Sequence, residues 1–599
     1  MTDAKAAGSR MTVAAVLVFL AGVLVYVNTL WNQFPFDDAV QVSDNLYIRS
    51  LQHVGKILAM PTWPGYVYRP LPTLTYSLTW MLVGPEPWLY HLTSALLHAG
   101  VSVLVLLLLA RVFGSATALL GALLFAVHPI HVEAVASVAN RTELLAALLG
   151  IGAVLLLVPR TRASQRRHGM LLRSVLGATC FFGALLAKES ALTLVVGVPL
   201  LVAAREEGFR GGLDRVRAVA RGSLWPLVTL GLAAAAFFVA RWWVLRDVVI
   251  ADVVMPPIDN PLVALAPHER IARAVALLGR YLVLCIFPWQ LSADYSLGAT
   301  GLADDLASPA PLLWLASCGA LAAATVVGAA RGSLRLVFIG AWFFAAFAIT
   351  ANVLLPIGTI FADRLAYVPS IAVCALLAWV LCQWRAVAAR TVAASVLVVT
   401  FALLTVAYNG VWYDDETLFG YEMRTSPSAK TEANYARLLL RRGDHAQARQ
   451  HFLAALQTYP EHMTAAYGMA FIELHEGRSD RAHAWLEKAI ESDPKYVPAL
   501  VLLGKLRFGA GEVDEAARFF VRALNADNHS FDAKLGILTA LLARGNLTQA
   551  TTLRDELIAL APQHAELLTL SADLDRRLAS AGRDSATSGA VALAGPGGA

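Results

Sequence analysis

Two adjacent carboxylates, Asp37 and Asp38, are the first residues in the chain whose type suits catalysis. They follow an uncharged run of twenty residues, Met11 to Leu30, which is long enough to cross a membrane. A carboxylate can accept the proton of a hydroxyl while that oxygen attacks an electrophile. Two close carboxylates repel each other, so one of them usually turns towards a cation or backbone amides. A helix cap or a solvated turn is the alternative that composition leaves open.

A second charged pair, Lys188 and Glu189, separates two apolar stretches that total 29 residues. Two full membrane spans need about 40 residues, so the tip of this hairpin is expected at or below the membrane interface. Ionisable groups at that depth usually face a protein cavity and mark function. The alternative is a pair that extends to the lipid headgroups and does nothing else.

Two polar motifs lie between further apolar segments, the run His128–Glu133 and the run Asn140–Glu143. The first and last residues of the second run match a capping box, which leaves Arg141 without a structural explanation. His128 and His131 of the first run could bind a metal, but no third ligand follows at a fixed spacing. We therefore favour these histidines as donors to a phosphate.

Membrane helices must position these residues, because the chain is too apolar for a set of soluble domains. Of its 599 residues 57% are hydrophobic and 15% are charged, and the mean hydropathy is +0.59. The five cysteines all lie in apolar segments, which argues against a disulfide framework or a thiolate zinc site. The apolar segments predict eleven spans, near residues 11–30, 89–110, 115–130, 144–159, 174–187, 190–204, 223–245, 311–329, 336–355, 367–384 and 391–408.

The loops between these spans alternate between arginine-rich loops and loops that carry acids and aromatic residues. The positive-inside rule then places the amino terminus in the cytoplasm and the residues after Tyr408 on the far side. The net charge of +5 is thus a matter of topology, and we predict no nucleic-acid partner. Arginine far outnumbers lysine, which favours a multi-pass protein of a bacterial inner membrane with a periplasmic C-terminal region.

One apolar stretch, Glu269 to Pro288, is excluded from the spans because it would invert the topology of everything after it. One helical face carries, at spacings of three and four, Arg270, Arg273, Leu277, Arg280 and Leu284. Such a charged stripe beside an apolar one is typical of an amphipathic helix. We predict that residues 269–288 lie on, or dip into, the outer membrane interface.

The C-terminal third repeats with a period of 34 residues, which is typical of tetratricopeptide repeats. Small residues in such repeats are expected to line helix crossings, and a proline ends the second helix. The recurring residues are Gly443, Ala448, Ala455 and Pro460, then Gly477, Ala482, Ala489 and Pro494, then Gly511, Ala516 and Ala523, and finally Gly545, Ala550 and Pro562.

The sequence therefore predicts three parts. Residues 1–410 form a multi-span membrane domain, residues 411–579 form a tetratricopeptide superhelix, and residues 580–599 form a disordered tail. Leu418, Phe419 and Pro427 fit a half repeat that would start the superhelix directly after the last span.

Seven motifs occur along the chain in a fixed order. They are Asp37-Asp38, Tyr68-Arg69-Pro70-Leu71, Tyr90-His91-Leu92, His128 to Val135, Arg141 to Ala146, Lys188-Glu189 and Arg364 to Ser370. With these motifs the chain resembles the transmembrane and tetratricopeptide-repeat O-mannosyltransferase family. The resemblance covers nearly the whole chain, repeats included. Two departures are Asp363, where the resemblance leads us to expect a glutamate, and a short repeat array.

This resemblance implies an all-α glycosyltransferase of the C-type (GT-C) fold, followed by an extracytoplasmic tetratricopeptide solenoid. The implied reaction moves a monosaccharide, such as mannose, from a polyprenyl or dolichyl phosphate to Ser or Thr hydroxyls of extracytoplasmic proteins. One carboxylate of the Asp37 and Asp38 pair is then the base, with Asp37 slightly favoured. The expected phosphate-binding residues are Lys188, Arg141, Arg364 and His131, with Glu189, Arg69, His128 and Glu133 in support.

The implied partners are a polyprenyl-phosphate lipid and an acceptor protein or peptide bound by the repeats. No cofactor is required by the sequence, although Asp37 and Asp38 could hold a divalent metal, and the choice stays open. Two other functions remain at this point. One is a polyprenyl-phosphate-sugar transferase that acts on lipid or polysaccharide, and the other is a non-catalytic, membrane-tethered repeat scaffold.

Overall fold

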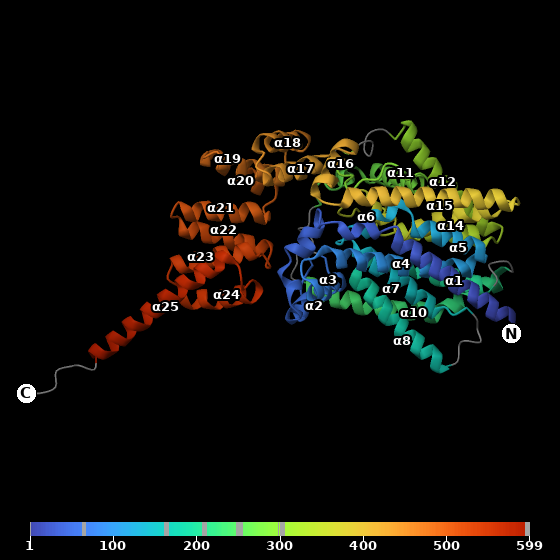
Figure 1. Ribbon diagram of the computed structural model, residues 1–599, viewed down its shortest axis with the longest axis horizontal. Helices are drawn as coiled ribbons and strands as arrows, with labels where there is room; N and C mark the ends of the chain where they lie inside the picture. The colour runs from blue at the N-terminus through green and yellow to red at the C-terminus, as the bar shows by residue number, and fades with distance from the viewer. Residues whose placement is uncertain are drawn as a thin grey trace, which may run out of the picture. The chain divides into compact units, whose positions relative to one another are not determined.

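The computed structural model describes residues 2–62, 67–160, 167–206, 212–246, 255–297, 299 and 306–592 (Figure 1). These residues are mainly helical and form no β-strand, and one isolated bridge joins Thr62 to Val67. The all-α prediction is confirmed. The chain forms two compact units, Met1–Thr431 and Glu432–Ala599, which we call the membrane unit and the repeat unit.

The membrane unit consists of sixteen α-helices and several 3₁₀ segments within the described ranges. The 3₁₀ segments used below are η5 (Pro129–His131), η7 (Glu189–Val196) and η10 (Asp363–Ala366). The helices are α1 (Thr2–Leu24), α2 (Val54–Ala59), α3 (Pro70–Val83), α4 (Pro87–Val112), α5 (Ser115–Ala126), α6 (Val132–Ala136), α7 (Arg141–Leu157), α8 (Arg167–Ala187), α9 (Gly197–Arg205), α10 (Gly212–Leu245), α11 (Pro267–Ile286), α12 (Pro309–Ala330), α13 (Leu334–Phe347), α14 (Ser370–Cys382), α15 (Val387–Asn409) and α16 (Asp415–Thr425).

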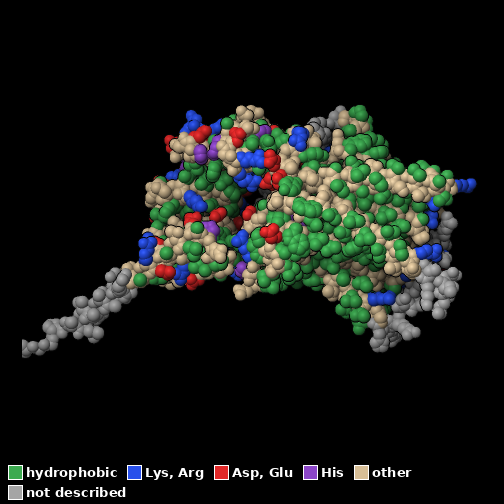
Figure 2. Space-filling view, in the orientation of Figure 1, with side chains coloured by type: hydrophobic (Ala, Val, Ile, Leu, Met, Phe, Trp, Pro, Cys, Tyr) green, Lys and Arg blue, Asp and Glu red, His purple; other side chains and the backbone are tan. Residues whose placement is uncertain are grey.

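Length and composition allow six of the described helices to cross a membrane, which confirms a membrane protein. The bent pair Ser115–Ala126 and Pro129–Ala136, with a bend of 49°, could add a seventh span. Hydrophobic side chains cover most of the visible face over α4, α5 and α15 (Figure 2). The six candidate spans are Gly8–Trp31, Pro87–Val112, Gly169–Ala187, Asp214–Leu245, Pro309–Ala330 and Val387–Trp412.

The other segments that the sequence predicted as spans are shorter helices, because their helical hydrogen bonding is interrupted. The predicted span 190–204 begins with the 3₁₀ turns of η7 and becomes α-helical only in α9. The predicted span 336–355 ends early, since α13 stops at Phe347 and Asn352 adopts a positive φ of 58°. Breaks of this kind shorten a helix without changing the apolar composition from which we counted eleven spans.

The predicted interfacial helix corresponds to α11, which is not among the six candidate spans. It packs closely on α12, because a Cβ added to Gly279 would overlap the backbone of Trp314. The guanidinium of Arg280 lies 5.0–5.2 Å from the ring centres of Tyr295, Trp314 and Phe361. Aromatic faces therefore surround this arginine. The position of α11 in the membrane interface stays a prediction.

The repeat unit is a series of antiparallel helix pairs, as the 34-residue period predicted. The regular 34-residue spacing of four glycines has a different cause from the helix crossings that we expected. Gly443, Gly477, Gly511 and Gly545 have φ of 75° to 82° at the turn inside each pair, where other residues are strained. The helices are α17 (Ala429–Arg441), α18 (His445–Thr458), α19 (Met463–His475), α20 (Ser479–Ser492), α21 (Val497–Gly509), α22 (Val513–Ala526), α23 (Phe531–Ala543), α24 (Leu547–Leu560) and α25 (Ala565–Ala592).

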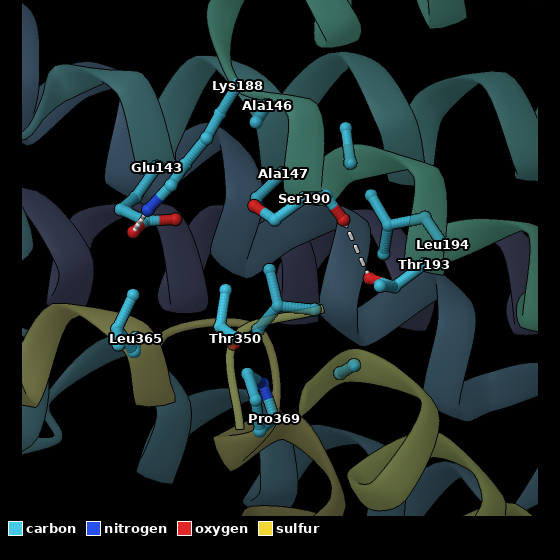
Figure 3. Close-up of a pocket in the computed structure, with 13 residues that line it drawn as sticks. Glu143, Ala146, Ala147, Lys188, Ser190, Thr193, Leu194, Thr350, Leu365 and Pro369 are labelled. Carbon is cyan, nitrogen blue, oxygen red and sulfur yellow. Dashed lines mark hydrogen bonds and ion pairs between the residues drawn. The ribbon is translucent and has the colours of Figure 1, made fainter. Parts of the chain in front are cut away.

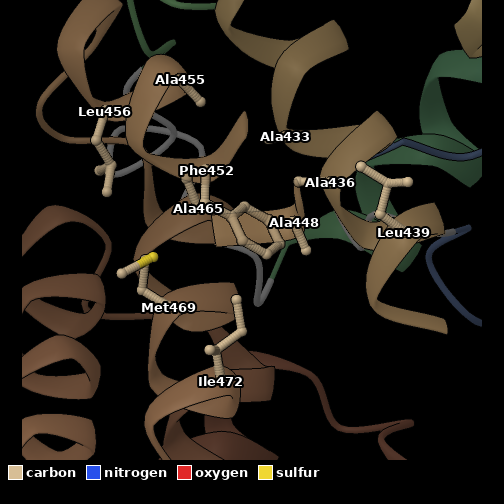
Figure 4. Packing of buried hydrophobic residues seen from close by; sticks show 10 residues of the cluster. All are labelled: Ala433, Ala436, Leu439, Ala448, Phe452, Ala455, Leu456, Ala465, Met469 and Ile472. Atoms are coloured by element: carbon tan, nitrogen blue, oxygen red, sulfur yellow. The ribbon is translucent and has the colours of Figure 1, made fainter. Parts of the chain in front are cut away.

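Close helix crossings in the repeat unit are made by alanines and by glycines outside the predicted pattern. Phe452 lies at the centre of a buried cluster with Ala448 and Ala465 (Figure 4). A Cβ on Gly468 would collide with the Phe452 ring. The alanine part of the prediction is confirmed, and the glycine part is wrong for the turn glycines, because they serve a backbone conformation.

The boundary between the units differs from the predicted one. Helix α16, which the sequence assigned to a half repeat, lies within the membrane unit, and the division follows Thr431. Leu418 and Phe419 of α16 are buried there. At the other end, α25 continues to Ala592, although we predicted disorder from residue 580. Residues 593–599 of the predicted tail lie outside the described ranges.

Candidate active site

Asp38 is fully buried, and three donors occupy its carboxylate. The Ser137 hydroxyl and the Val138 N–H lie 2.8 Å from its oxygens, and the Ala139 N–H lies 2.7 Å away. Burial raises the pKa of Asp38 to about 7, although these three donors oppose the rise. They come from the segment that leads into α7. Asp38 therefore positions that segment and is poorly placed to take a proton from a substrate.

Asp37 is half-buried, and its carboxylate makes no hydrogen bond with any residue that the structure describes. The positive charges that act on it are those of Arg364 and Lys430. Burial raises the pKa of Asp37, and these two charges oppose the rise. Asp37 thus combines an available carboxylate with nearby cations. From the sequence Asp37 is only slightly favoured over Asp38 as the base, and the geometry strengthens that preference.

The turn before Asp37 is strained and is held by contacts with α16 and the segment before it. Phe36 has a φ of 55°, which is rare for a bulky residue. Its N–H donates to Asp415 Oδ1 at 2.8 Å, and its ring packs edge to face on Phe419 at 5.9 Å between centres. The Gln33 N–H, in the same loop, donates to a carbonyl just before α16 at 2.7 Å. Helix α16 therefore fixes the direction of the carboxylate that follows Phe36.

Arg364 is oriented by Glu133. The Arg364 backbone N–H donates to Glu133 Oε2 at 2.7 Å, and the guanidinium forms an ion pair with the other carboxylate oxygen. The Glu133 side chain is 1% exposed and that of Arg364 is 26% exposed. Burial acts to lower the pKa of Arg364, but Glu133 and Asp37 hold it above its ordinary value. Since a guanidinium has five N–H donors, its exposed edge can still bind an anion.

Lys188 faces the protein interior, as we expected for an ionisable group at the tip of so short a hairpin. Its side chain is 9% exposed and forms an ion pair with Glu143. Both residues line a small pocket together with Ser190, Thr193 and Thr350 (Figure 3). Burial lowers the pKa of Lys188, and the Glu143 carboxylate opposes this effect. The charge of Arg364 also acts on Lys188, so the two cations belong to one electrostatic group.

The capping box predicted for Asn140 and Glu143 is wrong. The Asn140 side chain makes no cap hydrogen bond and donates to the Glu133 carbonyl at 3.2 Å. The Glu143 carboxylate is the counterion of Lys188. A buried lysine needs such a partner far more than a helix needs its cap, since an unpaired buried charge is several kcal/mol less stable.

Glu189 is held between two arginines. Arg69 Nη2 lies 2.8 Å and Arg241 Nη1 lies 2.6 Å from its carboxylate oxygens. Burial acts to raise the pKa of Glu189, but Arg69 and Arg241 hold it below its ordinary value. Arg241 was missed, although an arginine inside the apolar stretch 223–245 was a usable signal.

The structure does not place Arg141 with Lys188 and Arg364. Arg141 is fully buried and donates to Thr75 Oγ1 at 2.9 Å and to the Tyr90 carbonyl at 2.8 Å. Its guanidinium also lies 4.9 Å from the centre of the Tyr76 ring. With its donors and one face used in this way, Arg141 supports the packing of α3, α4 and α7.

The two histidines also have structural partners. His131 bonds to the Phe125 carbonyl at 2.9 Å and to Ser370 Oγ at 2.8 Å. His128 Nε2 lies 2.8 Å from the Cys285 carbonyl, and His128 Nδ1 accepts from a backbone N–H at the start of η5. Both rings are fully buried. They join helices distant in sequence, and neither is free to bind phosphate.

Several site residues were not identified from the sequence. Lys430 forms an ion pair with Asp259 and also acts on Asp37. Glu422 of α16 accepts from the Ser292 hydroxyl and, at 2.9 Å, from the Ala293 N–H. No spacing or motif in the sequence points to these contacts, because they join loops to residues far along the chain.

Asp363, the aspartate that departs from the family pattern, has a structural role. Its carboxylate accepts from the Tyr295 hydroxyl at 2.9 Å and from the Ser292 N–H at 3.1 Å. Burial raises its pKa well above the ordinary value. Asp363 therefore fixes the loop that also binds Glu422. Among the described residues, no group of three or more His, Cys, Asp or Glu side chains is arranged to hold a metal ion.

Comparisons with known proteins agree with the repeats. Models of the tetratricopeptide repeat match residues 435–497 and 507–574. Among solved structures, the oligosaccharyltransferase AglB from Archaeoglobus fulgidus, solved with an inhibitory peptide and a dolichol-phosphate, aligns over 67% of this chain and 56% of its own. The identity is 14% and the TM-score is 0.35, which is too low to establish a shared fold.

The curated relatives are protein O-mannosyl-transferases. The chain is 26% identical over 510 residues to TMTC3 of Mus musculus, which covers 79% of this chain and 54% of the relative. It is 28% identical over 520 residues to TMTC1 of Homo sapiens, which covers 78% and 57%. The chain thus spans little more than half the length of these relatives. The resemblance seen in the motifs is confirmed: over most of its length this chain is similar to the TMTC protein O-mannosyl-transferases.

Proposed function

We propose that the protein is a membrane glycosyltransferase of GT-C type that transfers a monosaccharide, mannose by analogy with its relatives, from a polyprenyl phosphate to Ser or Thr hydroxyls of proteins. The observation that carries this proposal is Asp37. Its carboxylate is free of hydrogen bonds to the described residues and lies in the field of two cations, on a strained turn. A non-catalytic scaffold does not need such a group. A strained turn destabilises a fold, so without a function a substitution that relieves the strain is favourable.

The reaction assigns a separate task to each charged group. The acceptor oxygen bonds to the anomeric carbon from the face opposite the phosphate, and the carbon–oxygen bond to the phosphate breaks. Asp37 takes the hydroxyl proton, and the leaving polyprenyl phosphate keeps the bonding electrons. The negative charge that grows on the phosphate is stabilised by Arg364 and Lys188. The configuration at the anomeric carbon is inverted.

Glu133, Glu143 and Glu189 act through these cations. Each carboxylate is buried or nearly so and holds one or two basic side chains in place: Arg364, Lys188, and the pair Arg69 and Arg241. A fixed cation stabilises developing charge without first having to reorganise. Asp38 and Arg141 position the segment between the first loop and α7, and His128 and His131 pack the helices behind it.

The repeat unit is proposed to bind the acceptor protein. Stacked helix pairs form a concave surface that suits an extended peptide or a helix. A protein truncated after Thr431 keeps α16 and the first loop. It should transfer sugar to a short peptide at high concentration and fail with a folded acceptor. Equal loss of both activities in a folded truncate would contradict this division.

The test of the proposed function is mass spectrometry of extracytoplasmic proteins from cells with and without the gene. We expect a hexose on Ser or Thr to disappear with the gene and to return with the wild-type protein. A gene for the Asp37→Asn variant should not restore it. If the hexose persists in cells without the gene, the protein is not this transferase.

The proposed orientation places the repeat unit on the periplasmic side of the inner membrane. Ser428 is 3% exposed and hydrogen-bonded, so it is a poor site for labelling. Thr458, at the end of α18, is exposed. Thr458→Cys should react with a membrane-impermeant thiol reagent when only the outer membrane is permeable. If the Thr458→Cys variant reacts only after the inner membrane is broken, the repeat unit lies in the cytoplasm and the proposed orientation is wrong.

A further inference from the structure

A second polar cavity lies at the other end of the membrane unit, away from Asp37 and Lys188. It has a volume of about 440 Å³, whereas one water molecule needs about 30 Å³. Arg173 of α8, Arg205 of α9 and Arg221 of α10 line it. Lys188 follows α8 fifteen residues after Arg173, which at 1.5 Å per residue is about 22 Å along the helix. This cavity is therefore separate from the candidate active site.

The cavity is strongly basic. None of the described residues that line it is acidic. Arg205 has a partner, because its Nε lies 3.2 Å from Glu206 Oε1. Arg173 Nη1 is buried and has no hydrogen-bond partner among the described residues. A buried guanidinium nitrogen without a partner is costly, which indicates that an anion completes its hydrogen bonding.

The space for that anion is built into the helix packing. Gly222 of α10 also lines the cavity. A Cβ there would lie 3.0 Å from Arg205 Nη2 and 2.8 Å from Val202 Cγ1. The absence of a side chain at this position lets α10 approach α9 while the Arg205 guanidinium keeps its place. Trp225, also on α10, donates from Nε1 to Ser174 Oγ of α8 at 2.9 Å, which fixes the indole in the lining of the cavity.

Exposed apolar side chains lie in and beside the lining of the cavity. Met170 and Trp225, which line it, are 40% and 52% exposed. The neighbours in sequence of lining residues are also exposed: Leu171 by 67%, Leu172 by 60% and Leu224 by 64%. In a membrane helix such residues contact acyl chains, and tryptophan favours the headgroup level. The site therefore presents guanidinium groups inside and lipid-facing side chains outside. A free anion would use only the first of these features.

We propose that this cavity binds the phosphate headgroup of an anionic phospholipid from the leaflet at the arginine-rich end of the membrane unit. Guanidinium groups match phosphate oxygens in pairs of parallel hydrogen bonds, and basic pockets between membrane helices bind such headgroups. The acyl chains then lie along Leu171, Leu172 and Trp225. The bound lipid connects α8, α9 and α10. Glu189 follows the C-terminal end of α8, and its partner Arg241 lies near the C-terminal end of α10.

Native mass spectrometry of the full-length protein tests this proposal. The detergent-purified protein is mixed with phosphatidylglycerol or with phosphatidylcholine, and the retained lipids are counted. We expect selective retention of phosphatidylglycerol. Arg173→Gln should weaken its binding about tenfold, as expected for the loss of a charge-assisted hydrogen bond. Arg385→Gln, which removes an exposed arginine outside the cavity, should leave binding unchanged.

Three results would overturn the proposal. The first is equal retention of the two lipids by the wild-type protein. The second is equal binding by Arg173→Gln and Arg385→Gln. The third is thermal stabilisation by inorganic phosphate as large as that by phosphatidylglycerol, which would identify a free anion as the ligand. If Arg173→Gln does not elute as a folded protein, Arg221→Gln takes its place, because Arg221 is exposed and lines the same cavity. Since the readout is lipid binding, the result does not depend on the transferase function.

Discussion

Contacts in the repeat unit join helices that are neighbours along the chain, whereas the polar contacts of the membrane unit join residues that are far apart. Phe452 packs on Gly468 of the next helix pair, and the same arrangement recurs between Phe520 and both Gly504 and Gly536. In the membrane unit, Arg364 and Glu133 are 231 residues apart. Asp38 and Val138 are separated by 100 residues.

Because of this difference, substitutions in the repeat unit should mainly affect stability, whereas substitutions in the membrane unit should affect the candidate active site. The repeat unit is a sum of local interfaces, so its shape should tolerate the loss of any single contact outside its core. The candidate active site depends on a few long-range polar contacts, each of which holds a charged group that has no substitute nearby. Substitutions of similar size should therefore have very different effects in the two units.

The largest effect is expected at Asp37. Asp37→Asn should retain donor-lipid binding and lower the turnover of sugar transfer by about 10²- to 10⁴-fold, the usual range for loss of a general base. Kinetics with purified protein, donor and a short acceptor peptide measure this change. Asp38→Asn is the matched control. It should chiefly lower the melting temperature, because the amide nitrogen replaces one carboxylate oxygen and cannot accept the hydrogen bonds made there, either that from Val138 or those from Ser137 and Ala139. If only Asp38→Asn abolished turnover in a stable protein, our assignment of the base would be wrong.

The ion pair of Lys188 and Glu143 offers a second test. Lys188→Met should lower the free energy of unfolding by about 3–5 kcal/mol, because it leaves Glu143 buried without a counterion. Adding Glu143→Leu should restore much of that stability. Thermal unfolding in detergent measures both variants. Donor binding should remain weak in the double variant, since the cation is still missing. Full recovery of donor binding would show that Lys188 does not contact the phosphate.

Substitutions of two glycines test whether the repeat unit depends on local contacts. Gly477→Ala should destabilise the protein by about 1–2 kcal/mol, because its φ of 75° is unfavourable for any side chain. Gly468→Ala should cost about 1–3 kcal/mol through overpacking against Phe452. Neither variant should change turnover with a short peptide. A change of more than a few-fold in a folded variant would mean that the repeats affect the chemical step.

The smallest expected effect is on pH dependence, where the two units should respond in opposite directions. Burial raises the pKa of Glu422 to about 7. The protonated Glu422 side chain therefore contributes its full stability below about pH 4.3, the pKa in the unfolded chain, and this contribution is lost as the pH rises through 7. Hydrogen bonds from Arg478 and Arg449 lower the pKa of Glu473 to about 2, so its contribution is present above about 4.3 and is lost as the pH falls through 2.

Melting temperatures of the variants at several pH values check this prediction. Relative to wild type, Glu422→Gln should gain stability between pH 5 and pH 8 by about 1–3 °C. Glu473→Gln should be destabilised at pH 6, and that deficit should shrink towards pH 3. Parallel pH profiles for the two variants would contradict the opposite pKa directions.

Periodicity explains which features could be predicted from the sequence. The repeats and their alanine crossings follow from the 34-residue spacing, and the apolar composition predicts a membrane protein. Which of the apolar segments form long continuous helices could not be predicted, because a 3₁₀ turn such as η7 or a positive φ at Asn352 leaves the composition unchanged. For the same reason α16 resembled part of a repeat, since apolar residues such as Leu418 fit the register whether they pack on a repeat or on the first loop.

The candidate site was predictable only in part, because a charged residue does not reveal its partner. Lys188 and Asp37 were found through their unusual position in or beside apolar segments. Arg141 and His131 have equally unusual positions, yet their hydrogen bonds are used within the fold. Lys430 lies in a polar segment where a lysine is ordinary, so its proximity to Asp37 is visible only in three dimensions.

The contacts of the first span and first loop with the end of the membrane unit have a consequence for biogenesis. The Asn409 side chain donates to the Val25 carbonyl at 2.9 Å, 384 residues away, and Asp415 holds Phe36 across 379 residues. At about 5–20 residues per second, a ribosome needs on the order of tens of seconds to make the intervening chain. Until then, Asp37 has no fixed orientation. The nascent protein is therefore inert while its helices insert, and it becomes competent only when the last of them is in the membrane.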